Sequence, residues 1–147
     1  DEIRKELIVT KDWTDREFRH ISGRLKNYQY NVGLQKSHLE ELNSILVEQR
    51  DLLMMLLVNP NLLEHETFTN LLHAVHHLMQ ELTYRKNLRN LPNTDYGHLA
   101  GDVRRVYMYL IHEWVDYMKY LKENYPYLFS LAMRTNPFDP DASPVVK

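Results

Sequence analysis

The chain has 147 residues, of which 44% are hydrophobic and 26% are charged, and its formal net charge is −2. This composition is typical of one globular domain, and the small net charge disfavours a protein that binds polyanions through its overall charge. The absence of cysteine excludes a disulfide scaffold and any zinc site made of thiolates. No apolar run approaches the roughly 18 residues that cross a bilayer, since the longest is Leu52–Val58. The chain does not begin with Met, so we expect a fragment or a processed chain.

Four glycines and almost no alternation of apolar and polar residues predict an all-α fold. Residues 1–13 form a lead-in, which is either a short extended piece or a frayed helix. Thr14 and Glu17 match a capping box, in which each side chain satisfies a free N–H group at the start of a helix. We therefore expect a long helix over residues 14–58, which Pro60 ends.

Within the expected helix, apolar residues recur every 3.5 residues, a period typical of a coiled coil. Ten of its twelve seam positions are apolar, and the other two are Gln35 and Gln49. These two glutamines are expected to fix register and oligomer number through buried hydrogen bonds. The expected interface between subunits consists of Phe18, Ile21, Leu25, Tyr28, Val32, Gln35, Leu39 and Leu42.

A break in the long helix is the alternative that the sequence leaves open. A continuous helix would be about 65 Å long, whereas a compact domain of this size is about 40 Å across. Gly23 and Gly33 each disfavour a helix interior by about 1 kcal/mol relative to alanine, and Tyr30–Gly33 has the composition of a turn.

Beyond Pro60 the apolar pattern predicts a bundle over residues 59–135. We expect helices over residues 67–85 and 95–124, followed by a short helix over residues 126–133. Residues 136–147 contain three prolines and are expected to form an irregular tail. The expected fold is three main helices plus a short fourth.

The second helix carries the candidate metal ligands. His73 and His77 are four residues apart and Glu81 follows one turn later, so all three share one face. Two imidazoles and a carboxylate can bind Zn²⁺, but histidines at the surface or in hydrogen bonds are the preferred explanation of this spacing, so we expect no metal. Asp102 and Arg105, on the third helix, are expected to pair across one turn.

No other motif indicates a reaction. The chain has no phosphate-binding glycine loop and no recognisable nucleophile motif, and its aromatic run lacks an interleaved basic patch. We therefore expect no catalytic residue, no cofactor and no nucleic-acid partner, and we expect that the protein is not an enzyme.

Several strings in the second half of the chain are distinctive. They are Asn59–Glu66, His77–Leu82, Leu91-Pro92, Asp95-Tyr96, His98–Asp102, Glu113–Val115, Tyr125–Ala132 and Asn136–Phe138. This stretch resembles the cytosolic C-terminal domain of archaeal and bacterial proteins with a two-helix ion-channel pore, including potassium-channel-like proteins. The pore itself is absent from this sequence, and no filter-like Thr-x-Gly-Tyr-Gly string occurs.

The resemblance implies a non-enzymatic assembly or regulatory domain at the cytoplasmic face of a membrane. Its partners would be the membrane-embedded pore of the same full-length chain and further copies, with a tetramer favoured and a dimer as the alternative. Two other functions fit the residues. One is a soluble, cytoplasmic metal-binding protein or enzyme that uses His73, His77 and Glu81, and the other is a soluble helical adaptor.

Overall fold

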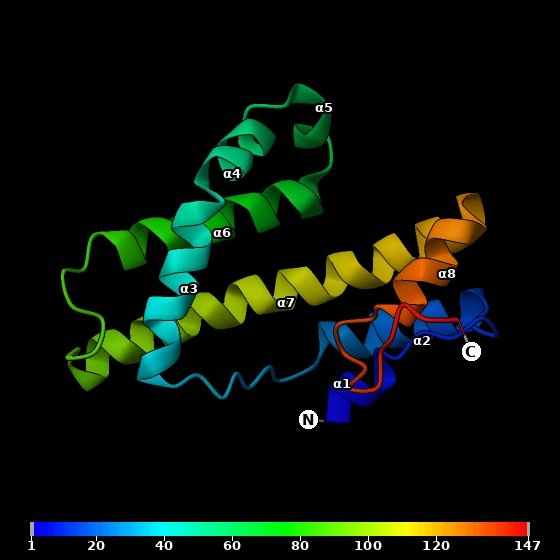
Figure 1. Ribbon diagram of the computed structural model, residues 1–147, viewed down its shortest axis with the longest axis horizontal. Helices are drawn as coiled ribbons and strands as arrows, with labels where there is room; N and C mark the ends of the chain where they lie inside the picture. The colour runs from blue at the N-terminus through cyan, green and yellow to red at the C-terminus, as the bar shows by residue number, and fades with distance from the viewer. Residues whose placement is uncertain (1, 147) are drawn as a thin grey trace. The chain divides into compact units, whose positions relative to one another are not determined.

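The computed structural model describes residues 2–146, and within this range the chain is all-α (Figure 1). Its helices are α1 (Glu2–Glu6), α2 (Asp15–Lys26), α3 (Lys36–Glu48), α4 (Arg50–Leu57), α5 (Pro60–Leu63), α6 (Glu66–Thr83), α7 (Asn93–Asn124) and α8 (Pro126–Arg134). The predicted all-α class is confirmed. Among the described residues, no helix combines the length and the apolar character that a membrane span requires.

The later helices lie where the apolar pattern placed them. The predicted helices over residues 67–85, 95–124 and 126–133 correspond to α6, α7 and α8. Pro126 occupies the first turn of α8, where its missing N–H costs nothing. The predicted capping box also forms, because the Thr14 N–H donates to Glu17 Oε2 at 2.7 Å and Arg16 N–H donates to Thr14 Oγ1 at 3.2 Å.

The continuous helix predicted over residues 14–58 is wrong, and the alternative break near Tyr30–Gly33 describes the chain better. Helix α2 ends at Lys26, α3 begins at Lys36, and a second interruption separates α3 from α4 at Gln49. The segment between α2 and α3 buries Tyr30, whose ring meets that of Tyr107 edge-on with centroids 6.2 Å apart. This burial offsets helical hydrogen bonds that the break removes.

The seam therefore does not continue through one helix. Phe18, Ile21, Leu25 and Leu39 are buried by the chain itself, whereas Tyr28, Val32 and Leu42 are half-buried. Gln35 and Gln49 are both exposed in the single chain, and their buried hydrogen bonds between subunits stay a prediction. Gln35 precedes α3, where its backbone N–H donates to His38 Nδ1 at 3.2 Å.

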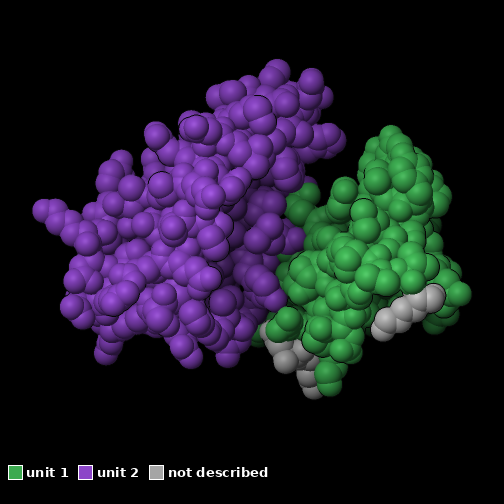
Figure 2. All heavy atoms as spheres, viewed as in Figure 1, with its two compact units in different colours: residues 1–29, 111–147 green, residues 30–110 purple. Residues whose placement is uncertain are grey.

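The chain divides into two compact units (Figure 2). Unit 1 comprises Asp1–Gln29 and Ile111–Lys147, and unit 2 comprises Tyr30–Leu110. Helix α7 contributes its first part to unit 2 and its second part to unit 1.

Unit 1 joins the two ends of the sequence. Lys122 on α7 donates from Nζ to the carbonyl oxygens of Lys11, at 2.6 Å, and Trp13. Asn136 is buried, and its Nδ2 donates to the carbonyl oxygen of Leu7 at 2.8 Å. The buried apolar residues of unit 1 are Ile3, Leu7, Val9, Phe18, Ile21, Leu25, Ile111, Val115, Met118, Leu121 and Phe129.

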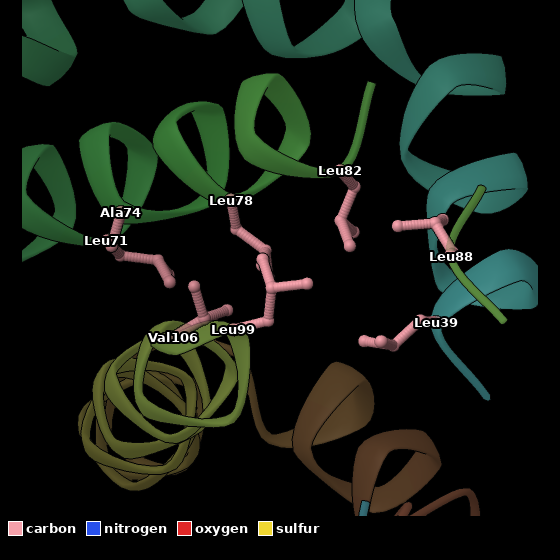
Figure 3. Close-up of a cluster of buried hydrophobic side chains, with 8 residues drawn as sticks. All are labelled: Leu39, Leu71, Ala74, Leu78, Leu82, Leu88, Leu99 and Val106. Atoms are coloured by element: carbon pink, nitrogen blue, oxygen red, sulfur yellow. The ribbon is translucent and has the colours of Figure 1, made fainter. Parts of the chain in front are cut away.

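Unit 2 is built around α6, which α3, α4 and α5 contact. Its main core has apolar side chains of α6 facing those of α3 and α7 (Figure 3). These side chains are Leu39, Leu71, Ala74, Leu78, Leu82, Leu88, Leu99 and Val106. The start of α3 is attached to the α6–α7 region by two bonds: Lys36 Nζ donates to the Leu91 carbonyl at 3.0 Å, and the Tyr96 hydroxyl donates to the Leu34 carbonyl.

Candidate metal centre

A polar cluster lies beside the core of unit 2, where α6 and α7 pack together. Helix α6 supplies His77 and Glu81, and α7 supplies His98 and Asp102. In each helix the two residues are four apart, so they share one face. Each of the four is followed by an apolar residue that belongs to the core or packs against it, namely Leu78, Leu82, Leu99 and Val103. The four polar side chains therefore lie at the edge of the contact between α6 and α7. Packing of the core thus brings together two pairs of side chains that come from different helices.

The nitrogen and oxygen atoms of this cluster are close to one another. The Nε2 atom of His77 lies 3.5 Å from Asp102 Oδ2 and 3.8 Å from Glu81 Oε1. The Nε2 atom of His98 lies 3.4 Å from Asp102 Oδ2 and 3.6 Å from Glu81 Oε2. One ligand atom each from His77, Glu81 and His98 can be chosen so that all lie within 4.8 Å of one another. The imidazoles are about half exposed, at 46% and 52%, so the cluster is open to solvent ions.

The two carboxylates are each held on one side by an arginine. Arg85 Nη1 donates to Glu81 Oε2 at 2.6 Å, and this bond holds the pKa of Glu81 below its ordinary value. Arg105 Nη1 donates to Asp102 Oδ1 at 3.0 Å, which confirms the predicted pairing of these residues. The side chain of Asp102 is only 4% exposed, and its other oxygen, Oδ2, is buried and has no hydrogen-bond partner among the residues that the structure describes.

Arg85 lies in the loop between the two helices and links Glu81 on α6 to Asp95 in the first turn of α7. Its guanidinium donates to both carboxylate oxygens of Asp95, from Nε at 2.8 Å and from Nη2 at 2.6 Å. The same group donates to the backbone carbonyl of Glu81 at 2.5 Å. These bonds lower the pKa of Asp95 and raise that of Arg85, chiefly through their mutual hydrogen bonds. Glu81 is therefore oriented before any ion arrives.

Two interpretations of the cluster compete. Imidazole nitrogens and carboxylate oxygens are the ligands that zinc and neighbouring divalent transition metals use in proteins that lack thiolates. Alternatively, protonated histidines form ion pairs with the carboxylates. In the second interpretation, two protonated imidazoles 3.4 and 3.5 Å from Asp102 Oδ2 would compensate the charge of this buried oxygen, although neither forms a hydrogen bond to it in the structure.

The sequence identified half of this cluster. His77 and Glu81 take part as predicted, whereas His73 lies outside the cluster and is exposed. His98 and Asp102 were not predicted as metal ligands. Their four-residue spacing on α7 repeats that of His77 and Glu81 on α6, and this repetition is the signal that could have identified them.

Comparison with known proteins identifies a matching family and a curated relative of this chain. Residues 1–134 match the family described as "Uncharacterized protein MJ1433, C-terminal helical domain". The uncharacterized protein MJ1433 of Methanocaldococcus jannaschii is 45% identical over 137 residues, which are 93% of this chain and 56% of that protein. The chain therefore spans little more than half the length of the curated relative it matches. No solved structure matches it.

Proposed function

The chain belongs to the family of the MJ1433 C-terminal helical domain, and we propose that it is a helical module that binds one divalent transition-metal ion between α6 and α7. The observation that carries the proposal is the convergence of His77, Glu81 and His98 from two helices, with ligand atoms within 4.8 Å of one another.

Arg85 supports the proposal because it orients Glu81 without occupying the whole carboxylate. Its bond goes to Oε2, which leaves the Oε1 atom directed toward His77, at 3.8 Å from that imidazole. Groups that orient a metal ligand through a hydrogen bond improve metal affinity. Their removal typically weakens metal binding by roughly 10- to 100-fold.

An ion at this position would cross-link the two helices. His77 and Glu81 come from α6, and His98 comes from α7 beyond the loop at residues 84–92. Because the ion binds only the folded arrangement, it would stabilise that arrangement by about 2.7 kcal/mol at a free concentration 100-fold above its dissociation constant.

The test is zinc titration of the full chain purified without a histidine tag, followed by calorimetry and thermal unfolding. We expect one ion per chain and a higher melting temperature with zinc. His98→Ala should abolish both effects, whereas His73→Ala, which removes an exposed histidine of α6 outside the cluster, should leave both unchanged. Equal zinc binding by the wild type and His98→Ala would contradict the proposal.

The expectation of a cytosolic ion-channel domain that assembles as a homo-oligomer stays a prediction, as does the expectation that the protein is not an enzyme. No contact within residues 2–146 tests the ion-channel role or the absence of enzymatic activity. The metal-binding proposal depends on neither expectation.

A further inference from the structure

We infer that Asp102 is a fourth ligand and that the ion occupies a closed, four-coordinate site of the zinc class, with the structural role of fastening α7 to α6. This inference rests on the proposed function, because it concerns the same ion. It adds the coordination number, the class of metal and the role of the site.

Two of the distances between candidate ligand atoms fit a tetrahedron around zinc. Asp102 lies outside the set of ligand atoms that are all within 4.8 Å of one another, so the four side chains would have to move closer together around the ion. Ligand nitrogens and oxygens lie about 2.0–2.1 Å from Zn²⁺, so neighbouring ligand atoms of a regular tetrahedron are about 3.3–3.4 Å apart. Asp102 Oδ2 lies 3.4 Å from His98 Nε2 and 3.5 Å from His77 Nε2. Calcium and magnesium instead favour six or more ligands, chiefly oxygen atoms. The two imidazoles and the short edges therefore select a transition metal.

The burial of Asp102 provides an independent argument. Its Oδ2 atom has no hydrogen-bond partner among the described residues, although its side chain is 4% exposed. A buried carboxylate oxygen needs a compensating charge or donor. A cation between Asp102 and the two imidazoles would supply that charge while both imidazoles stay neutral.

In both carboxylates, an arginine donates a hydrogen bond to one of the two oxygens. Arg85 binds Glu81 Oε2, and Arg105 binds Asp102 Oδ1. The other oxygen of each carboxylate, Oε1 or Oδ2, lies near His77, and the arginine-bound Oε2 of Glu81 also lies 3.6 Å from His98 Nε2. With two imidazoles and two carboxylates as ligands, protein atoms fill all four positions, which is typical of structural zinc sites and leaves no position for a substrate.

Asp102→Asn should therefore reduce the stabilisation by zinc without lowering the stability of the metal-free protein. Without metal, the substitution removes a buried charge that lacks a full complement of partners, so the melting temperature should stay the same or rise. With zinc, the variant lacks a charged ligand, so the stabilisation by the ion should be smaller than in the wild type.

Cobalt provides a direct test, because four-coordinate Co²⁺ absorbs visible light far more strongly than six-coordinate Co²⁺. We expect the intense spectrum for the wild type with one equivalent of Co²⁺ and its loss in Asp102→Asn, with folding verified by circular dichroism. Asp116→Asn, which changes an exposed carboxylate elsewhere on α7, is the matched control and should keep the wild-type spectrum.

Asp102→Cys keeps the test decisive if Asp102→Asn does not fold. The natural chain has no cysteine, so a thiolate-to-cobalt charge-transfer band in the near ultraviolet would place position 102 in contact with the ion. Asp116→Cys should give no such band. If Co²⁺ binds with a weak six-coordinate spectrum, or binds Asp102→Cys without the band, this inference fails and the proposed function stands. If neither Co²⁺ nor Zn²⁺ binds the wild type, both fail.

Discussion

Arg85 holds Asp95 through two parallel hydrogen bonds, at 2.8 Å from Nε and 2.6 Å from Nη2, across the loop that joins α6 to α7. Its third nitrogen donates to the side chain and the backbone carbonyl of Glu81. One guanidinium therefore fixes the loop and orients a candidate metal ligand. A lysine cannot make this planar, forked contact.

Arg85→Lys should thus affect both stability and metal binding. We expect the free energy of unfolding to fall by about 1.5–3 kcal/mol, because charge-assisted hydrogen bonds are lost from a largely buried group. Zinc affinity should fall by roughly 10- to 100-fold. Urea denaturation and calorimetric titration measure the two effects.

The control for Arg85→Lys is Arg89→Lys in the same loop. Arg89 pairs with Glu40 at 2.7 Å, but its side chain is 74% exposed. Exposed ion pairs contribute about 0–1 kcal/mol, so this variant should leave zinc affinity unchanged. Similar losses of affinity in both variants would show that Arg85 has no special role.

The sequence predicted the fold class and the later helices because those helices have strong local signals. Leu78 and Leu82 recur at helical spacing, and Pro126 lies in the first turn of α8. The course of residues 14–58 was not predictable in this way. Phe18 and Leu39 satisfy the same 3.5-residue pattern, yet they are buried in different units, and this division depends on tertiary packing.

The residues of the candidate site also differ in whether local sequence or tertiary packing brings them together. His77 and Glu81 are neighbours on one helix, so their spacing alone predicted that they would meet. His98 and Asp102 join them only because the core of unit 2 packs α7 against α6. The burial of Asp102 is likewise a consequence of packing, because it depends on the contacts of α7 with α6 and not on the residues next to Asp102 in the sequence.

The break between α2 and α3 can be tested with proline. Asn31 is exposed and lies outside any helix, so Asn31→Pro should change the free energy of unfolding by less than about 1 kcal/mol. Ser44→Pro, at an exposed position inside α3, should cost about 3 kcal/mol or more. If Asn31→Pro lowers the free energy of unfolding in urea denaturation as much as Ser44→Pro does, by about 3 kcal/mol or more, Asn31 lies in a helix and the break is contradicted.

Asn136 should be important for the stability of unit 1. It is 1% exposed, its Nδ2 donates to the Leu7 carbonyl at 2.8 Å, and its Oδ1 accepts from the Phe138 N–H at 2.9 Å. Asn136→Ala removes the buried hydrogen bond to the Leu7 carbonyl, which keeps its bond from the Val9 N–H, and the part-buried bond from the Phe138 N–H, so we expect a loss of about 1–3 kcal/mol in the free energy of unfolding. The control is Asn124→Ala, because Asn124 is exposed and its Nδ2 donates to the carbonyl of Tyr120, one turn earlier in the same helix. Equal stability of the two variants would contradict this role.

The capping box of α2 predicts a dependence of stability on pH. Hydrogen bonds from the Thr14 side chain and backbone hold the pKa of Glu17 below its ordinary value of 4.5. Its contribution is therefore present above that value and is lost as the pH falls through the lower pKa of the folded state.

Glu17→Gln should consequently reduce the fall in melting temperature between neutral pH and a pH of about 3. Glu64→Gln, at an exposed position outside the capping box, should keep the full dependence of the wild type. An unchanged dependence in Glu17→Gln would rule out the capping box as its source.

The most direct test of the central claim is anomalous diffraction from a crystal of the full chain grown with zinc, measured on both sides of the zinc absorption edge. We predict one strong anomalous peak between α6 and α7, about 2.0–2.2 Å from the Nε2 atoms of His77 and His98 and from an oxygen each of Glu81 and Asp102. A crystal in which zinc binds elsewhere, while these four side chains keep their ion pairs without an ion, would contradict the account.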